Sequence, residues 1–279
     1  MARLRFTKMH GIGNDYVYVD CFATTVADPA ALARRVSPRR TAIGSDGVIL
    51  ICPSDVADCR MEMYNADGSR GDMCGNGIRC VGKYVYDHGL VRKPELRIDT
   101  DAGIKLVQLH THDGHATAAT VDMGEPVLDG PHIPVAAEGR VINAPLQVGG
   151  QTYAVSCISM GNPHCVVFVE DVAALALSEI GPRFEHHAFF PKRVNTEFVR
   201  VISRAELRMR VWERGSGETA ACGTGACAVV VAAVLNDKAD RRATVHLNGG
   251  DLAIEWRVAD NHVFMTGPAE EVFTGEIEV

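Results

Sequence analysis

The sequence lacks the features that mark membrane, secreted and nucleic-acid-binding proteins. Its longest apolar run, residues 226–235, has ten residues, whereas a helix that spans a bilayer needs about 20. The N-terminal MARLRFTKMHGIGND contains no apolar segment of the kind found in secretory signals. There is no basic run or aromatic platform, and the formal net charge is −7, which argues against a nucleic-acid partner. We therefore expect a small-molecule partner, with no membrane and no nucleic acid.

A disulfide framework is also missing, although the chain has nine cysteines. The number is odd and no Cys-x-x-Cys pair occurs, so neither paired disulfides nor a zinc ribbon is indicated. Several cysteines, such as Cys52 and Cys165, lie inside apolar runs and are expected to be buried, reduced thiols. A reducing, cytoplasmic compartment fits this pattern best.

Short strand-like segments dominate the sequence and do not alternate regularly with helices. Helices are expected at 29–36, from just after Cys74 to Gly89, and at 226–235, where the segment is apolar all round and should be buried in its domain. Strands are expected at 3–8, 16–20, 48–52, 96–99, 104–109, 116–123, 151–159, 165–170, 196–202, 206–213 and in the tail 244–279. This pattern indicates an α+β fold rather than a doubly wound sheet.

One short element occurs twice in the chain. Cys-Gly-Asn-Gly begins at Cys74, and Cys-Gly-Thr-Gly begins 148 residues later at Cys222. Other landmarks share the spacing: Asn14 and Asn162, Asn65 and Glu213, and Arg60-Met61 and Arg208-Met209. An ungapped offset over so many positions predicts an internal duplication, with one cysteine at the start of a helix in each half.

A thiol at a helix start has a defined chemistry. First-turn amides have no intrahelical acceptor, and the helix dipole adds positive charge there. This environment is expected to lower a thiol pKa and to favour a bound carboxylate. Two such ends facing one cleft could hold an amino-acid carboxylate, while one thiolate removes the α-proton and the other thiol delivers one to the opposite face. The paired elements therefore predict inversion at an α-carbon without a cofactor or a metal.

Longer motifs give the chain a specific resemblance. MHGIGNDYVYVD, YNADGSRGDMCGNGIRC, MGNPHCVVFV, RVNTEF and VWERGSGETAACGTGACA closely resemble diaminopimelate epimerase, in the expected order from Met9 to Ala228. The resemblance implies a cofactor-independent isomerase that interconverts LL- and meso-diaminopimelate for lysine and peptidoglycan synthesis. It also implies two pseudo-symmetric halves, each a curled mixed sheet around a central helix, with the active site in the cleft between them. The expected halves are 1–122 with about 268–279, and 123–267; a homodimer is also implied.

The resemblance assigns roles to particular residues. Cys74 and Cys222 match the proton donor and acceptor, and His164 and Glu213 match residues that tune the thiols. The backbone amides that receive the reacting carboxylate match Gly75, Asn76, Gly223 and Thr224. The side chains that contact the substrate match Asn14, Asn65, Asn162, Asn195, Glu213 and Arg214.

Two of these positions need separate comment. Some family members carry a substrate-binding glutamine where this chain has Gly47, so water or backbone is expected to replace it. Arg214 would ordinarily be read as a solvated surface arginine. Its place in the duplicated segment and its bidentate guanidinium instead favour binding of the second carboxylate of the substrate.

Two other functions remain open. A proline-type racemase would use the same paired thiols, but Arg214 and the asparagines favour a longer substrate with two amino-acid centres. A thiol redox sensor or binding protein that uses Cys74 and Cys222 as a switch would exchange no α-proton with solvent.

Overall fold

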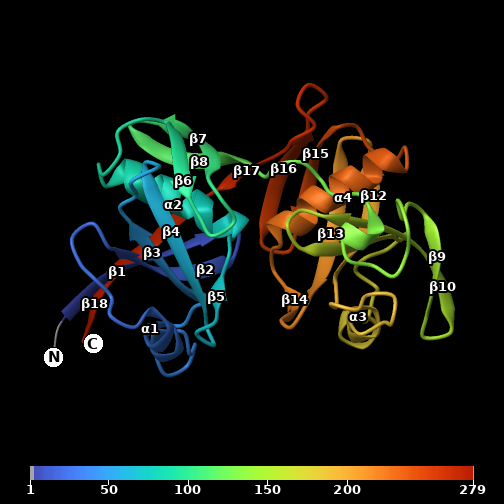
Figure 1. Cartoon of the computed structure of the whole chain (residues 1–279), viewed down its shortest axis with the longest axis horizontal. Coiled ribbons are helices and arrows are strands. Elements are labelled where there is room, and N and C mark those ends of the chain that lie inside the picture. The colour runs from blue at the N-terminus through green and yellow to red at the C-terminus, as the bar shows by residue number, and fades with distance from the viewer. Residues whose placement is uncertain (1–2, 279) are drawn as a thin grey trace. The chain divides into compact units, whose positions relative to one another are not determined.

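The computed structural model describes residues 3–278. They form two compact units, one running to Val121 and resuming at Thr266, the other Asp122–Met265 (Figure 1). None of the described helices is long and apolar enough to cross a membrane.

The first unit is a mixed sheet with two helices. Its hydrogen-bonded order is β18, β1, β2, β3, β4, β6, β7, β8, with the short β5 added on β4; the β2–β3 and β4–β6 pairs are parallel and the others antiparallel. The elements are β1 (Arg3–Gly11), β2 (Asn14–Asp20), α1 (Pro29–Val36), β3 (Gly47–Cys52), β4 (Cys59–Asn65), β5 (Arg70–Gly71), α2 (Gly75–Asp87), β6 (Glu95–Asp99), β7 (Lys105–His112), β8 (His115–Asp122) and β18 (Glu270–Glu278).

The second unit repeats this connectivity. Its order is β9, β10, β11, β12, β13, β15, β16, with β14 added on β13; β11–β12 and β13–β15 are parallel and the others antiparallel. The elements are the 3-10 turn η1 (Gly130–His132), β9 (Ala144–Val148), β10 (Gln151–Ser159), β11 (Pro163–Phe168), α3 (Leu177–Glu185), β12 (Asn195–Ser203), β13 (Glu206–Glu213), β14 (Gly217–Thr219), α4 (Gly223–Leu235), β15 (Arg242–Leu247) and β16 (Gly250–Trp256). Strand β17 (Val263–Pro268) begins in the second unit and ends in the first.

The strand registers of the two units are related by the same 148-residue offset as the sequence motifs. Tyr16 pairs with Gly47 between β2 and β3, and His164 pairs with Asn195 between β11 and β12. Each of these residues is 148 positions from its counterpart, as are the first residues of α2 and α4. Beside β1, the C-terminal β18 takes the edge position that β9 takes beside β10. The last strand of the chain therefore completes the first unit.

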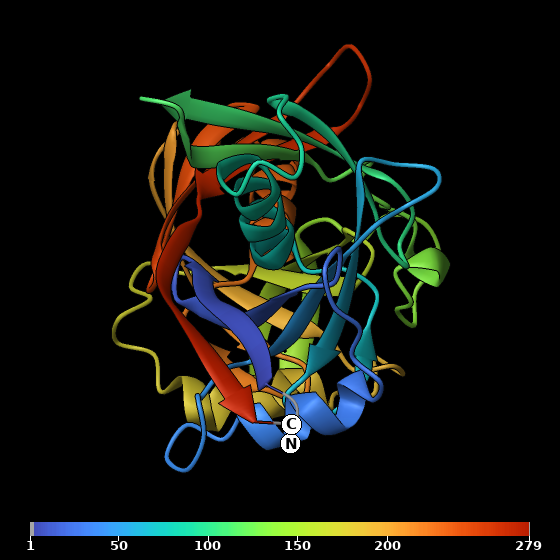
Figure 2. The same ribbon diagram turned by 90° about the vertical axis from the view of Figure 1, so that its left-hand side faces the viewer.

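Each unit encloses one helix. Helix α2 contacts β1, β2, β6 and β7, and α4 contacts β10, β11, β12, β15 and β16; Figure 2 shows α2 with strands on several sides. In α4 every residue from Gly225 to Ala233 is buried, as its uniform apolarity predicts. The expected α+β class, with a mixed sheet around a central helix in each half, is confirmed.

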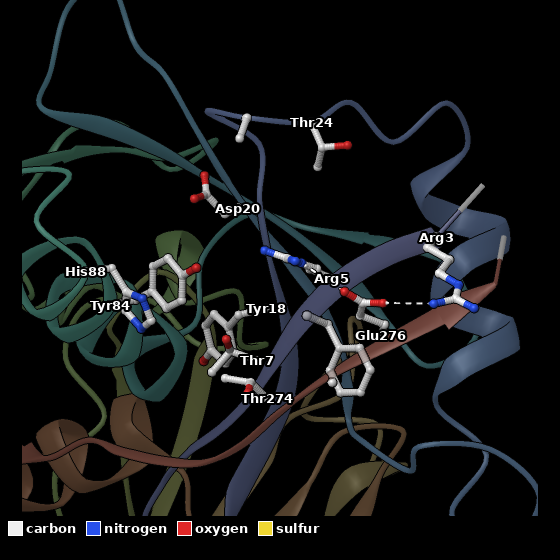
Figure 3. A pocket seen from close by; sticks show the side chains of 13 residues that line it. Arg3, Arg5, Thr7, Tyr18, Asp20, Thr24, Tyr84, His88, Thr274 and Glu276 are labelled. Carbon is white, nitrogen blue, oxygen red and sulfur yellow. Dashed lines mark hydrogen bonds and ion pairs between the residues drawn. The ribbon is translucent and has the colours of Figure 1, made fainter.

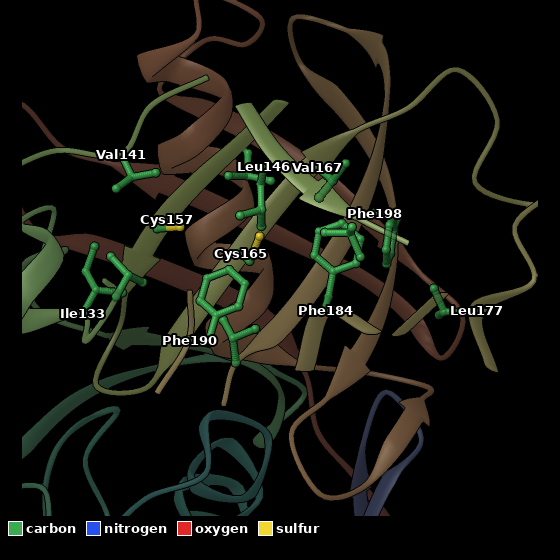
Figure 4. Packing of buried hydrophobic residues seen from close by; sticks show 14 of the residues in the cluster. Ile133, Val141, Leu146, Cys157, Cys165, Val167, Leu177, Phe184, Phe190 and Phe198 are labelled. Atoms are coloured by element: carbon green, nitrogen blue, oxygen red, sulfur yellow. The ribbon is translucent and has the colours of Figure 1, made fainter. Parts of the chain in front are cut away.

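One helix was not expected from the sequence. Helix α3 contains Gly181 and Pro182, which disfavour helix interiors. Tertiary packing overrides the local preference: Leu177 and Phe184 enter the apolar core of the second unit (Figure 4). A Cβ on Gly181 would lie 2.3 Å from the ring of Trp212, so only glycine allows this approach.

Candidate active site

Cys74 is the residue immediately before α2. It has extended backbone angles, and its Sγ accepts a hydrogen bond from the Gly77 amide at 3.3 Å. The thiol therefore accepts a hydrogen bond from one first-turn amide. The backbone amides of Gly75 and Asn76 lie in the same turn, where an amide has no helical carbonyl four residues earlier to bond. Cys74 is partly exposed, whereas Gly75 and Asn76 are buried. The sequence expectation of a thiol at a helix start holds here.

Asn14 lies against this thiol in a fixed orientation. Its Nδ2 donates to Asp46 Oδ2 at 2.7 Å, which turns its Oδ1 toward Cys74 Sγ, 3.3 Å away. Asp46 also accepts from Arg39 at 2.7 Å. The side-chain Nδ2 of Asn76 donates to the same Asn14 oxygen, at 3.4 Å. Asp46 and Arg39 thus set which end of the Asn14 side chain faces the thiol.

Asn65 and Gly47 are direct neighbours across β3 and β4. The Asn65 side chain donates to Ser69 Oγ at 2.9 Å. A Cβ on Gly47 would lie 2.0 Å from the carbonyl oxygen of Tyr64. This backbone accepts no side chain at position 47, so no side-chain amide can be supplied there.

Cys222 occupies the matching position before α4. Its backbone angles, φ −127° and ψ 107°, nearly repeat those of Cys74, φ −128° and ψ 119°. Cys222 is more buried, with 6% of its surface exposed. Its Sγ lies 3.5 Å from the Thr224 hydroxyl, and Gly223 is buried in the same turn.

A buried histidine–glutamate pair lies beside Cys222. His164 Nδ1 and Glu197 Oε1 are 2.7 Å apart, and both side chains are 0% exposed. One donor atom from each of the two and the Cys222 sulfur lie within 4.8 Å of one another. Nitrogen, oxygen and sulfur donors could hold a divalent metal, but His164 Nδ1 and Glu197 Oε1 already lie at hydrogen-bond distance from each other.

The surroundings of Cys222 oppose ionisation of its thiol. Burial raises the pKa of Cys222 well above its ordinary value, and the Glu213 and Glu197 carboxylates raise it further. The Thr224 hydroxyl and the Gly225 amide lower it, but by less. The lowered pKa expected from the helix start alone is therefore wrong for Cys222, because burial and two carboxylates outweigh the helix terminus.

The remaining expected site residues lie around this second thiol. Asn162 Oδ1 is 2.9 Å from His164 Nε2. Asn195 is buried, donates to the Pro163 carbonyl at 3.2 Å, and accepts from the Arg214 amide at 2.8 Å. Asn195 thereby ties β11 to the turn after β13.

Glu213 and Arg214 end β13 and begin that turn. Glu213 Oε1 accepts from the Thr219 hydroxyl. The Arg214 side chain is exposed, and its Nη1 donates to the Lys192 carbonyl at 3.1 Å. A single backbone contact leaves most of the guanidinium donors for a ligand.

Sequence reasoning missed Glu197, Asp46 and Arg39. Glu197 carried a usable signal, because a charged residue inside a strand of β-branched and aromatic residues, Thr196–Val199, must find a partner if the strand is buried. Asp46 and Arg39 had no such signal, since acidic and basic residues in loops are ordinary.

The first unit also contains a cavity of about 730 Å³ away from these residues (Figure 3). Its lining includes Arg3, Arg5, Asp20, Tyr84 and His88, and none of the expected site residues. Arg3 and Glu276 form an ion pair at 3.7 Å there. The chemistry expected from the two thiols therefore lies elsewhere.

Comparison with known proteins decides the family. The model of the diaminopimelate epimerase family matches residues 6–128 and 156–272. The chain belongs to the diaminopimelate epimerase family. A diaminopimelate epimerase of Acetivibrio thermocellus is 56% identical over 277 residues, with 99% of each chain covered. One of Agathobacter rectalis is 56% identical over 284 residues, covering 99% of this chain and 100% of the other.

The fold of the diaminopimelate epimerase family extends to more distant proteins. The solved structure of a probable proline racemase from Agrobacterium radiobacter superposes with a TM-score of 0.72 at 15% identity, covering 99% of this chain and 93% of that one. This similarity concerns the fold alone. Membership of the family confirms the resemblance seen in the motifs.

Proposed function

We propose that this protein is an isomerase that interconverts LL- and meso-diaminopimelate, without a cofactor, in the synthesis of lysine and peptidoglycan precursors. The observation that carries the proposal is the pair of cysteines at equivalent helix starts in two units of the same fold. Full-length relatives at 56% identity that are named diaminopimelate epimerase support the substrate.

In the proposed reaction, residues 1–122 with 268–279 and residues 123–267 each contribute one half of the site. Amides of the two helix starts, at Gly75 and Asn76 and at Gly223 and Thr224, hold the carboxylate of the reacting centre. Hydrogen bonds there stabilise the negative charge that develops when the α-proton leaves. One thiolate takes that proton, and the other thiol delivers a proton to the opposite face of the carbon.

The second amino-acid centre of the substrate keeps its configuration and must be recognised. Arg214 supplies a cation for its carboxylate. Acceptors for the ammonium groups come from Glu213 and from the asparagines Asn14, Asn65, Asn162 and Asn195. His164 and Glu213 adjust the proton affinity of the thiols.

Substrate competition tests the proposal. LL-diaminopimelate, L-proline and trans-4-hydroxy-L-proline are each incubated with the purified chain, and the stereoisomers are separated by chiral chromatography. We expect inversion of LL-diaminopimelate alone. Inversion of proline or hydroxyproline instead would identify a racemase of the related fold. Inversion of none of the three, by a folded chain with reduced thiols, would favour a redox sensor.

Two further properties follow from the family resemblance. We propose a cytoplasmic location, consistent with the cysteine content, and assembly as a homodimer. Light scattering on the purified chain tests the assembly, and a mass of one chain, 30.1 kDa, would contradict it.

A further inference from the structure

Two of the nine cysteines lie side by side at the ends of β2 and β3 in the first unit. The register of this parallel pair matches Asp20 with Ile51, and the Cys21 amide continues it by donating to the Ile51 carbonyl at 2.8 Å. In that register Cys21 lies opposite Cys52. Neighbouring strands are about 4.7–4.9 Å apart, and a disulfide joins residues whose Cα atoms are about 4.4–6.8 Å apart. The backbone therefore already holds the two residues within the range of a disulfide.

The two side chains also point to the same face of the sheet. Val19 on β2 and Leu50 on β3 belong to the apolar core that includes residues of α1. Two positions further along each strand, where side chains return to the same face, Cys21 and Cys52 pack against this core. The two thiols lie close enough to form a hydrogen bond with each other. Formation of a bond between their sulfurs thus needs no rearrangement of the strands.

A second pair of opposed cysteines provides an internal comparison. Cys157 on β10 lies opposite Cys165 on β11, and these thiols also form a hydrogen bond. Both are 0% exposed within the core of the second unit (Figure 4). Cys21 and Cys52 are each partly exposed, although the apolar run around Cys52 predicts burial. An oxidant dissolved in water can therefore reach the first pair, but not the second while the second unit stays folded.

The second unit has the same strand pairing at the corresponding place without the thiols. Val169 and Arg200 lie 148 residues after Cys21 and Cys52. The Val169 amide donates to the Val199 carbonyl at 2.8 Å, which repeats the bond that the Cys21 amide makes in the first unit. This strand pairing thus requires no cysteine at either position, and the proposed reaction requires neither of the two thiols.

We propose that Cys21 and Cys52 form a redox modification site, at which a small-molecule disulfide of the glutathione class converts the two thiols reversibly into an intramolecular disulfide. A hydrogen bond from Cys21 lowers the pKa of Cys52, so the Cys52 thiolate attacks first and displaces one glutathione thiolate. The Cys21 thiol then loses its proton, and its sulfur attacks the mixed disulfide and releases the second glutathione. One disulfide bond breaks and one forms, and the two thiol protons end on the two released glutathiones.

The disulfide would close a segment of the first unit. Residues 22–51, between the two cysteines, contain α1 and also Asp46, which accepts from the Asn14 side chain. A cross-link over such a segment stabilises the folded unit mainly by restricting the unfolded chain. We therefore expect the oxidised chain to unfold at a higher temperature than the reduced chain.

The test treats the reduced full chain with glutathione disulfide and then maps its cysteines. Acid stops thiol exchange, and N-ethylmaleimide then blocks the remaining thiols as the chain is unfolded. Digestion uses a protease that cleaves before aspartate, because Asp55 and Asp58 lie between Cys52 and Cys59 and put these two cysteines on different peptides. Mass spectrometry without reductant identifies each linked pair.

We expect peptides linked through Cys21 and Cys52 that dithiothreitol separates. This link should form at least about tenfold faster than any link between Cys157 and Cys165, because those thiols react only when the second unit opens. Cys21→Ser is the matched variant, and its Cys52 should hold one glutathione in place of the protein disulfide.

Differential scanning fluorimetry gives a second readout. Oxidised wild type should show a Tm at least about 2–4 °C above that of the reduced chain, and oxidised Cys21→Ser should show no such rise. Recovery of Cys21 and Cys52 unlinked, equal rates for the two cysteine pairs, or a link that leaves Tm unchanged would overturn the inference. None of these outcomes depends on inversion of LL-diaminopimelate, so the proposed function is tested separately.

Discussion

Replacing Gly225 by alanine would place a methyl group against Glu197 and Cys222, two buried residues of the candidate site in the second unit. The new Cβ would lie 2.6 Å from Glu197 Oε1 and 3.2 Å from Cys222 Sγ. Glu197 is fully buried and bonded to His164, so it cannot rotate away at low cost. Overpacking of this kind costs about 1–3 kcal/mol, while an alanine in a helix returns about 0.8–1.0 kcal/mol relative to glycine. The net effect is a destabilisation of about 1 kcal/mol, or roughly 2–4 °C in Tm for a chain of this size.

The expected loss of activity is larger than the loss of stability. A displacement of about 1 Å in a reacting group can cost about 100-fold in rate, and the overlap pushes directly on the thiol and on its carboxylate neighbour. Differential scanning fluorimetry measures Tm, and turnover of LL-diaminopimelate measures activity.

Gly77→Ala is the matched control in the other unit. Its Cβ would also meet an atom at 2.6 Å, but that atom is the terminal methyl of Ile49, which can rotate. We expect a Tm close to that of wild type and a smaller loss of activity. A Gly225→Ala variant that is as active as wild type and no less stable would refute the geometry described for Glu197 and Cys222.

Three other outcomes follow from the site. Cys74→Ala and Cys222→Ala should each abolish inversion of LL-diaminopimelate. The serine variants should fold but lose most activity, because a hydroxyl is a much weaker base than a thiolate. Near-wild-type turnover of either alanine variant would contradict the two-thiol mechanism. Arg214→Ala should cost about 1.5–3 kcal/mol in kcat/KM through loss of a charge-assisted hydrogen bond to the distal carboxylate, and kinetics equal to wild type would remove that role. Peroxide should inactivate the enzyme reversibly: one thiolate becomes a sulfenic acid with release of water, and the second thiol condenses with it to a disulfide with release of another water. Peptide mapping that recovers the Cys74 and Cys222 peptides unlinked would reject this route.

Much of the fold follows from local sequence signals. The start of α2 at Gly75 and its end near Gly89 follow from glycine at both ends and an apolar stripe between them. The turn between β7 and β8 follows from the dipeptide Asp113-Gly114, since both residues adopt the positive φ that such a turn needs, 50° and 81°. Helix α3 could not be expected, because its stability comes from burying Leu177 and Phe184 against residues distant in the sequence rather than from its own propensities.

The candidate site, like the fold, follows from the sequence only in part. Duplicated spacing locates Cys74 and Cys222 at helix starts, because a repeated motif keeps its place in a repeated fold. The electrostatic environment of Cys222 has no counterpart in the motif itself. It depends on Glu197, whose position beside Gly225 is set by the pairing of β12 with its neighbours and by burial that only the folded unit creates.

The most direct measurement of the central claim is proton NMR of LL-diaminopimelate in D₂O with the purified chain and no added cofactor or metal. The mechanism predicts that the α-proton signal falls as solvent deuterium enters, and that meso-diaminopimelate forms at the same time. The Cys74→Ala and Cys222→Ala variants should leave the meso isomer unformed. An α-proton signal that stays constant in the presence of the folded wild-type chain would contradict the account.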